Sequence, residues 1–333
     1  MSFERVMRRI GVKSVNTKDC EYVTRQLIFG KMFRKPFIVE IPRRSLREPL
    51  GGHADRFTYE ETSGIVTKRC KSLKTAKSAR EWYRVAPVKV RDKYMPKLLE
   101  SKDEACLIMK DATHGLDPES TSVMDIKIGT RSYAEDVSTR HVDDRYVKKL
   151  RKQYGIVRET CSKREYMKFR DSRSTTASMG FRVTAMSVPI QRKRYTALTC
   201  GQIQGIRWYD ANGFENTAIQ TLQFFAYDGR SVRNDALLKL ASEIRDLKDR
   251  LSKSSSFAEH EIIGSSLLVI FDRKTGKVSI KWIDFAHARA ANAVPWMQIV
   301  WRQAVWPHHY NPIVARRRAC KAQQTGQTKQ EPC

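Results

Sequence analysis

Three short segments, far apart in the chain, each place polar side chains at one end of an apolar run. Asp125 and Lys127 stand in MDIKIG, Ser265 and Ser266 in GSSLL, and Asp284 in WIDFAH. In phosphoryl transfer, charge spreads over the oxygens of the transferred group, so a protein supplies carboxylates for a metal, a lysine for the phosphates and a group that orients the attacking hydroxyl. These residue types therefore suit phosphoryl transfer.

The spacing of Asp125 and Lys127 adds to this interpretation. Side chains two residues apart in a strand lie on the same face, so both can face one bound reactant. The Asp-x-Lys pattern also occurs by chance, and its alternative meaning is a surface ion pair. The other two segments are therefore needed to distinguish a catalytic pair from a surface ion pair.

Short apolar runs of strand length predict the elements that position these residues. The expected strands are Cys106 to Asp111, Val123 to Ile128, Gly180 to Met186, and a hairpin of 265–271 with 278–283. The second of these carries the Asp-x-Lys pair, and the hairpin delivers Asp284 at its end.

Other stretches predict a mixed α and β chain. Residues 51–91 indicate a β-rich unit, with a hairpin at Ser63-Gly64 that leads into Lys68. The basic run 133–173 is typical of a solvated helical face. Apolar residues at helical spacing predict a helix over 235–251, with Asn234 or Asp235 as its N-cap. The chain after Ala288 reads as irregular, and 322–333 as disordered.

Composition limits the class of protein. Sixty-three Lys and Arg against 36 Asp and Glu give a net charge of +27, which favours a polyanionic partner. Zinc-finger spacing, an aromatic RNA-binding strand and internal repeats are missing, so we expect no specific nucleic-acid partner. The seven cysteines form no CxxC pair, which argues against zinc and disulfides. Without an apolar run of membrane-spanning length or a secretory start, we expect no membrane span and a cytoplasmic protein, with a nuclear pool also open.

The segments TSVMDIKIG, SSLLVIFD and IDFAH, in this order, resemble the signature of the inositol polyphosphate kinase family, PxxxDxKxG followed far downstream by SSLL and IDF. The likeness extends over about 36–296. It implies a two-lobed α+β fold similar to protein kinases and ATP-grasp enzymes, with an antiparallel sheet in the N-lobe. The implied domains are a regulatory appendage (1–47), an ATP-binding N-lobe (48–117), a C-lobe (118–295) with a helical substrate-binding insert (134–176), and a divergent, partly disordered tail (296–333).

Within the family, GGHADRF, GIVTKRC, REYMKFRDSRSTTASMGFR and FAEHEIIGSSLL are similar to the inositol trisphosphate 3-kinases. This resemblance implies ATP-dependent phosphorylation of inositol 1,4,5-trisphosphate to the 1,3,4,5-tetrakisphosphate. The motif IDFAH is more similar to the corresponding motif of the multikinases and hexakisphosphate kinases, so these activities remain alternatives. Because the tail diverges from the family, a further alternative is a weakly active scaffold protein that binds inositol phosphates.

The resemblance also implies roles for individual residues. Asp125 would orient or deprotonate the attacking hydroxyl, and Lys127 would contact the substrate or the transferred phosphoryl group. Asp284, helped by Ser266, would hold Mg²⁺, an ion that prefers oxygen ligands. The implied ATP contacts are Lys68, Asp111 and Ser266, and the implied substrate contacts are Lys127, Tyr166, Lys168, Arg170 and Arg182. For Asp111, the alternative is a carboxylate that caps its own turn.

The N-terminal stretch 22–41 combines bulky apolar residues with Arg and Lys. Such a segment can form an amphipathic helix that fills an apolar groove, as calmodulin targets do. The alternative is a β-strand packed on the N-lobe, which Gly30 favours because glycine weakens a helix. The trisphosphate 3-kinases carry a calmodulin-binding stretch just before the lobe, so the resemblance implies calmodulin as a partner.

Overall fold

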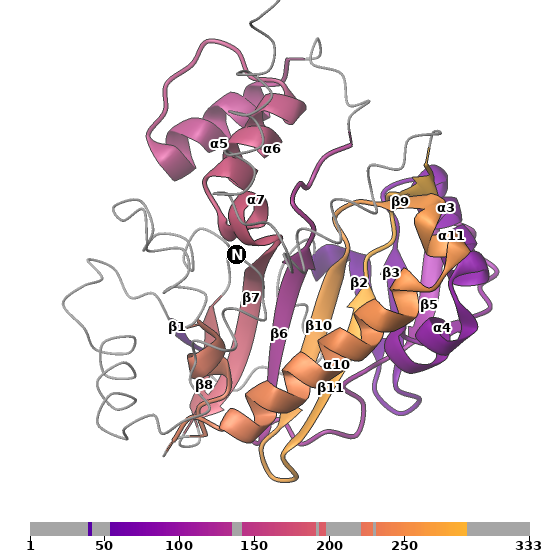
Figure 1. Cartoon of the computed structure of the whole chain (residues 1–333). Coiled ribbons are helices and arrows are strands. Elements are labelled where there is room, and N and C mark those ends of the chain that lie inside the picture. Colours follow the sequence, from indigo (N-terminus) through magenta and orange to yellow (C-terminus); the bar gives the residue numbers. More distant parts are fainter. Residues whose placement is uncertain are drawn as a thin grey trace, which may run out of the picture.

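The computed structural model describes residues 39–41, 54–134, 142–190, 193–197, 221–228 and 231–291. These residues form two antiparallel sheets with helices around them (Figure 1). The smaller sheet has the order β2-β3-β5-β4, with β2 Phe57–Glu60, β3 Ile65–Arg69, β4 Leu98–Leu99 and β5 Cys106–Lys110. The larger has the order β1-β8-β7-β6-β10-β11, with β1 Val39–Ile41, β8 Lys193–Ala197, β7 Phe181–Ile190, β6 Thr121–Ile128, β10 Ser266–Asp272 and β11 Lys277–Ile283. The predicted two-lobed α+β fold is confirmed.

The smaller sheet contains the predicted hairpin, formed by β2 and β3. Its turn needs a glycine at position 64, where φ is +62° and a Cβ atom would overlap the ring of His114. The prediction of a β-rich unit as far as residue 91 is wrong beyond β3, because α3 (Leu73–Val85) and α4 (Val88–Tyr94) follow. Ser72 caps α3 in a capping box with Thr75, and the buried residues of α3 recur at helical spacing.

The larger sheet places β6 between β7 and β10. Leu268 of β10 lies opposite Asp125, and Ser266 lies opposite Lys127. The predicted strands of this sheet are confirmed, and β6 and β7 are longer than predicted. The hairpin of β10 and β11 is also confirmed, so the two motif strands lie side by side.

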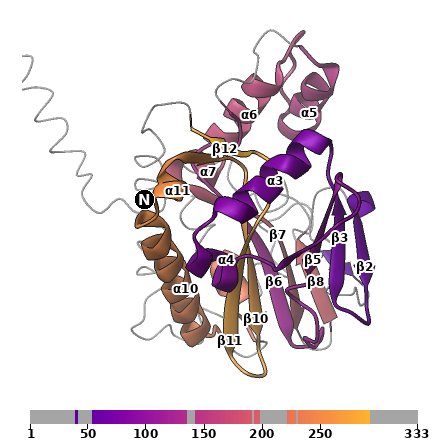
Figure 2. The same cartoon turned by 90° about the vertical axis from the view of Figure 1, so that its right-hand side faces the viewer.

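Helix α10 (Asn234–Ser252) lies along β11 and β10 in both views of the molecule (Figures 1 and 2). Its buried Leu and Ile residues confirm the predicted helix and its apolar face. The predicted N-cap is wrong: the cap residue is Arg233, without a side-chain cap bond, and its guanidinium binds the carboxylate of Asp235. The short helix α11 (Ser255–Ala258) and a two-stranded sheet of β9 (His260–Ile262) and β12 (Ala288–Ala290) complete this region.

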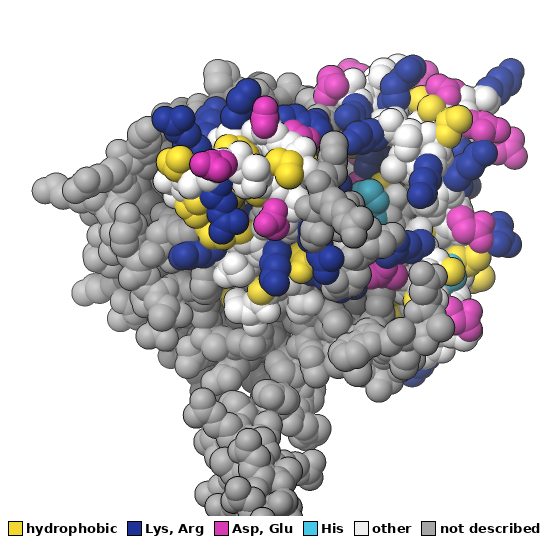
Figure 3. Space-filling model, turned by 90° about the horizontal axis from the view of Figure 1, so that it is seen from above, with side chains coloured by type: hydrophobic (Ala, Val, Ile, Leu, Met, Phe, Trp, Pro, Cys, Tyr) yellow, Lys and Arg dark blue, Asp and Glu magenta, His cyan; other side chains and the backbone are white. Residues whose placement is uncertain are grey.

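The basic run forms α5 (Asp144–Tyr154) and α6 (Lys163–Ser172), which with the following α7 (Thr175–Met179) make a helical insert beyond the end of the larger sheet. Leu150, Cys161 and Tyr166 form a small core of its own. Lys and Arg side chains gather over α5 and α6, with hydrophobic side chains between them and fewer acidic ones (Figure 3). The prediction of a solvated helical face is confirmed for α5, whereas Lys163 and Arg170 of α6 are half-buried.

The ends of the chain are described in part. Strand β1 pairs with β8 in the larger sheet, so the predicted strand on the N-lobe is wrong for Val39–Ile41. Strand β12 corrects the prediction of an irregular chain from Ala288. The predicted appendage apart from β1, and the tail beyond 291, lie outside the described residues. Within the described residues no helix is long and apolar enough to cross a membrane, and Cys70, Cys106 and Cys161 are free thiols.

Candidate active site

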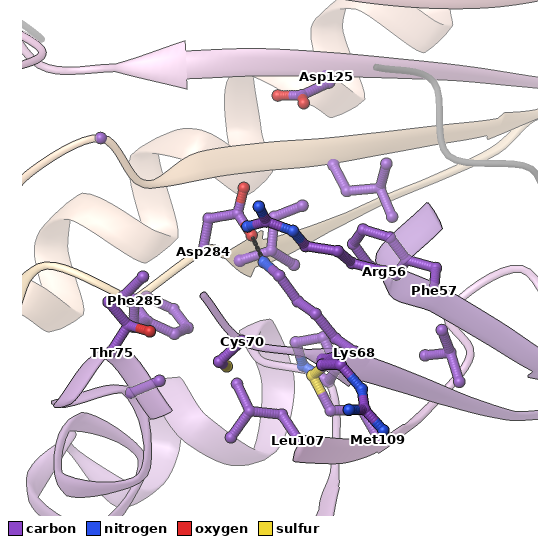
Figure 4. Close-up of a pocket in the computed structure, with 18 of the residues that line it drawn as sticks. Arg56, Phe57, Lys68, Cys70, Thr75, Leu107, Met109, Asp125, Asp284 and Phe285 are labelled. Atoms are coloured by element: carbon purple, nitrogen blue, oxygen red, sulfur yellow. Dashed lines mark hydrogen bonds and ion pairs between the residues drawn. The ribbon is translucent and has the colours of Figure 1, made fainter. Parts of the chain in front are cut away.

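A pocket of about 480 Å³ lies between the two sheets (Figure 4). Strands β3 and β5 line one side, and β6 with the end of β11 lines the other. Five of the residues predicted from the motifs line this pocket: Lys68, Asp111, Asp125, Lys127 and Asp284. Its volume falls in the range of small-molecule sites.

Asp284 directly follows β11 and has an unusual backbone conformation. Its φ is 70°, and among the described residues other than glycine it alone has a positive φ. The next residue, Phe285, is fixed by edge-on ring contacts, with centroids 5.0 Å from Trp282 and 5.5 Å from Tyr83. Such strain persists where the surroundings enforce it and is frequent at functional sites.

The carboxylate of Asp284 joins the two lobes. Lys68 on β3 donates a hydrogen bond to its Oδ1, drawn as a dashed line in Figure 4. Burial alone would raise the pKa of Asp284, but the positive charges of Lys68 and Lys127 outweigh it and bring the pKa below its usual value. Asp284 is therefore ionised and can hold a cation.

Asp125, on β6, has the opposite shift. Burial raises its pKa, the charge of Lys127 opposes this rise, and the charge of Asp284 adds to it. The hydroxyls of Ser266 and Thr184 lie near enough to lower the pKa a little. A carboxylate with a raised pKa is a better proton acceptor near neutral pH than an ordinary one.

The oxygen atoms at this site fit a divalent metal such as Mg²⁺. Within the described residues no three acidic, His or Cys side chains cluster as a metal cage. Mg²⁺ does not need one, because it takes one or two carboxylates and completes its shell with phosphate oxygens and water. Asp284 is ionised at the pocket, and the buried Oδ1 of Asp125 accepts no well-formed hydrogen bond from the described residues. Ser266, fully buried, is paired with Lys127 across β10 and β6 and places a hydroxyl near Asp125.

Asp111 begins the connection between the two sheets. Its backbone N–H donates to the carbonyl of Gly64 at 2.8 Å, and its Oδ1 accepts from both the N–H and the hydroxyl of Thr113 at 2.8 Å. The predicted cap of its own turn is therefore confirmed. Because Asp111 also lines the pocket, the ribose contact stays a prediction.

The substrate residues predicted on the insert take part in its internal structure. Tyr166 is buried and stacks on Tyr146 with centroids 5.3 Å apart. Arg170 donates to the hydroxyl of Ser132 at 2.6 Å and lies 5.8 Å from the Tyr166 ring. Lys168 is exposed on α6. None of these residues lines the described pocket, so their contacts to substrate stay predictions.

Arg182, also predicted to contact substrate, is only 4% exposed. Its Nη1 donates to Asp171 at 3.1 Å and to Thr176 at 3.0 Å, and Asp171 is itself 3% exposed. This buried pair connects β7 to α6 and α7.

We expect Arg182→Ala to lower the free energy of unfolding by about 3 kcal/mol, because it removes the nearer of the two cations that face the buried Asp171. The substitution leaves Asp171 with Arg170 at 3.7 Å and the hydrogen bonds from Ser132. Urea denaturation followed by circular dichroism measures the loss, with the exposed Lys168→Ala on the same insert as a near-neutral control. Unchanged stability with a higher KM for substrate would instead support the direct contact predicted from the motif.

Two cations and a histidine at the pocket were not singled out from the sequence. Lys163 opens α6 behind the capping box of Ser162 and Glu165, and it lines the pocket with Lys71 and His287. Burial, followed by the charge of Lys163, lowers the pKa of His287. The S-x-x-E pattern at 162–165 could have marked Lys163 as the start of a helix. This cationic wall suits an anion.

The buried carboxylate of Glu261 forms ion pairs with arginines from two different segments near the site. Glu261 on β9 accepts from Arg131 at 2.6 Å and from Arg289 at 2.7 Å. Arg131 follows β6, which carries Asp125, and Arg289 lies in β12, which follows Asp284. Glu261 therefore holds the two motif segments in a fixed relation, which the sequence did not indicate.

Comparison with known proteins decides the family. The model of the family "Inositol polyphosphate kinase" matches residues 106–309, well over half of the chain. The chain belongs to the inositol polyphosphate kinase family. The resemblance inferred from the three motifs is confirmed.

Individual relatives are distant. The chain is 28% identical over 255 residues to an inositol-trisphosphate 3-kinase homolog of Caenorhabditis elegans, covering 72% of this chain and 47% of the relative. It is 26% identical over 273 residues to human inositol-trisphosphate 3-kinase A, covering 76% and 53%. The chain thus spans about half the length of these curated relatives. A solved inositol phosphate multikinase is similar with a TM-score of 0.47 and 17% identity, covering 68% of this chain and 96% of that one.

Proposed function

We propose that this chain transfers the γ-phosphoryl group of ATP to a hydroxyl of an inositol polyphosphate, with inositol 1,4,5-trisphosphate as the favoured acceptor and the 1,3,4,5-tetrakisphosphate as the product. The observation that supports this most directly is one pocket shared by Lys68 from the smaller sheet, Asp125 and Lys127 from β6, and Asp284. The names of the curated relatives support the choice of acceptor.

The side of the pocket formed by the smaller sheet suits a nucleotide. Val66, Leu107 and Met109 offer an apolar wall for a base, and Lys68 extends from the same sheet toward Asp284. In the proposed complex Lys68 binds the ATP phosphates, while Asp284 and Ser266 hold Mg²⁺. Held there, Mg²⁺ would supply positive charge that neutralises part of the charge on the phosphates.

The opposite side suits the acceptor and the transferred group. Asp125 accepts a hydrogen bond from the attacking hydroxyl and takes its proton as the new P–O bond forms, while the bond from the γ-phosphorus to the bridging oxygen of the β-phosphate breaks and ADP leaves. Lys127, two residues along the same strand, stabilises the charge on the transferred phosphoryl oxygens. Lys163, on the insert side of the pocket, adds a cation that suits the phosphates of the acceptor.

The proposal is tested by offering the purified chain ATP, Mg²⁺ and a panel of inositol phosphates. Products are separated by anion-exchange chromatography, and the phosphorylated position is assigned by NMR. We expect one product, the 1,3,4,5-tetrakisphosphate. Turnover of several isomers, or of the hexakisphosphate, would favour the multikinase or hexakisphosphate kinase alternatives. Tight binding without turnover would favour the scaffold.

We expect Arg170→Ala to raise the KM for the inositol phosphate about tenfold or more while changing the KM for ATP little. Arg170 is part-buried on the insert near Ser132 and Tyr166, away from the nucleotide wall, and its charge suits a phosphate. Steady-state kinetics with each substrate varied in turn measures both constants, and Lys152→Ala on α5 is the control. A larger change in the KM for ATP would place this residue on the nucleotide side.

Calmodulin remains a proposed partner of residues 22–41. Residues 22–38 lie outside the described residues, and Val39–Ile41 form β1. We expect a peptide of 22–41 to bind calmodulin in Ca²⁺ and to be released by a chelator, because helix formation buries its apolar anchors in the Ca²⁺-opened groove. Isothermal titration in both conditions measures this. Equal binding in both, or none in Ca²⁺, would remove calmodulin as a partner.

A further inference from the structure

The outward side of α5 is strongly charged, and the proposed reaction does not use it. The inward side packs Tyr146, Val147, Leu150 and Tyr154 into the insert core. The exposed cations of the helix are Arg145, Lys148, Lys149, Arg151 and Lys152. At 3.6 residues per turn these five cations share one broad face, which we call the cationic face of α5.

Most of this charge is not neutralised locally. Within the described residues Arg145 pairs with Asp143, whereas Lys148, Arg151 and Lys152 make no ion pair. Some exposed cations on other helices are paired: Lys93 on α4 contacts two carboxylates of α10, and Arg84 on α3 contacts Glu81. Lys74 and Lys89 are exposed and make no ion pair within the described residues, but each stands apart from other unpaired cations on its helix, whereas α5 gathers three on one face. A surface of unpaired cations attracts a polyanion, and the net charge of +27 strengthens the attraction.

An apolar side chain lies at the end of the same helix. Gly155, with φ of 67°, ends α5, and Val157 follows it with 78% of its surface exposed. The other exposed large hydrophobic residues of the described chain range from 45% to 58%. Cations on a helix, followed directly in the chain by an exposed aliphatic group, match the interface of a bilayer, where anionic head groups meet acyl chains. Nucleic-acid phosphates would use the cations but not Val157.

We propose that the cationic face of α5, with Val157 at its end, docks on the anionic surface of a lipid bilayer. The α5 helix packs on the opposite side against its own insert core, so docking needs no rearrangement of that core. The proposal does not depend on the proposed reaction, because the cations of this face do not line the pocket between the sheets.

The experiment is co-sedimentation of the full chain with vesicles, without ATP or substrate. Neutral phosphatidylcholine vesicles are compared with vesicles that also contain about 30% phosphatidylserine. The test variant carries Lys148→Gln, Arg151→Gln and Lys152→Gln. A matched control removes the same charge from exposed lysines elsewhere, with Lys74→Gln, Lys89→Gln and Lys102→Gln.

We expect the control to bind anionic vesicles as the native chain does. Each cation near such a surface contributes roughly a fivefold gain in affinity, so the test variant should bind on the order of a hundredfold more weakly. Val157→Ser should weaken binding at low salt and at high salt, because its contribution is not electrostatic.

Three results would overturn the proposal. Equal losses in the two triple variants would mean that net charge alone attracts the vesicles. Equal binding to neutral vesicles would remove the role of the cations. The third result concerns a short RNA duplex. If the duplex bound the native chain more tightly than vesicles do and displaced it from them, and if the test variant no longer bound the duplex, the face would be assigned to nucleic acid instead.

Discussion

Asp284→Asn is expected to lower kcat by a factor of about a thousand or more while leaving the protein folded. A neutral amide holds Mg²⁺ far less well than a carboxylate, and the ion neutralises charge on the transferred phosphoryl group. The low pKa of Asp284 keeps the native side chain charged beside Lys68 and Lys127, so the substitution removes a full negative charge from the site. Coupled-assay kinetics across a range of Mg²⁺ concentrations measures the loss.

The substitution is well matched to the backbone at this position. Asparagine tolerates a positive φ better than most residues, so the φ of 70° should not itself unfold the variant. A thermal melt checks this, and Asp249→Asn on the exposed side of α10 is the control for loss of a carboxylate. If Asp284→Asn kept turnover within tenfold of the native chain, the metal assignment would be wrong.

The strands that carry the motifs could be predicted because their signals are local. β5, β6 and the hairpin of β10 with β11 are short apolar runs bounded by turn residues, and each run has strand length. Helix α3 was missed although its buried residues recur at helical spacing. The β-prone residues before it, through Lys68, led the prediction to extend the β-rich unit too far.

The predicted site was less complete, because charge alone does not say which cations are neutralised. Arg182 and Arg170 belong to the same basic run or its continuation, yet Arg182 is buried against Asp171, eleven residues away along the chain. Lys163 belongs to that run too, and it lines the pocket. The sequence could not separate these arginines and lysines, since their roles depend on how the insert folds back on the end of β6.

The N-cap of α10 also could not be predicted from residue type alone. Asn234 and Asp235 are good N-cap residue types, but the helix begins one position earlier, after Arg233. The carboxylate of Asp235 binds the Arg233 guanidinium, so it is not available as a cap. This contact accounts for Asp235 only, because Asn234 is the first residue of the helix and its Oδ1 accepts no hydrogen bond from the described residues.

Lys127→Ala is expected to lower kcat/KM by a factor of about a hundred to a thousand, because a preorganised charge next to the transferred group is lost. The matched control is Lys274→Ala. Lys274 lies in the turn of the β10 and β11 hairpin, its side chain is 69% exposed, and its surface ion pair with Asp117 contributes little to stability or activity. The control should keep native kinetics.

The pH dependence separates a charge effect from a packing effect. Lys127 lowers the pKa of both Asp125 and Asp284, so its removal should raise both pKa values. In the proposed reaction Asp125 acts in its deprotonated form, hence the acidic limb of the kcat/KM profile should move to higher pH in Lys127→Ala and stay in place in Lys274→Ala. Lys127→Arg should return the acidic limb to its native pH because it restores the positive charge, even if the larger guanidinium group lowers the maximal rate. An acidic limb that stays in place in Lys127→Ala, or equal losses of activity at positions 127 and 274, would show that Lys127 does not act on the reacting groups.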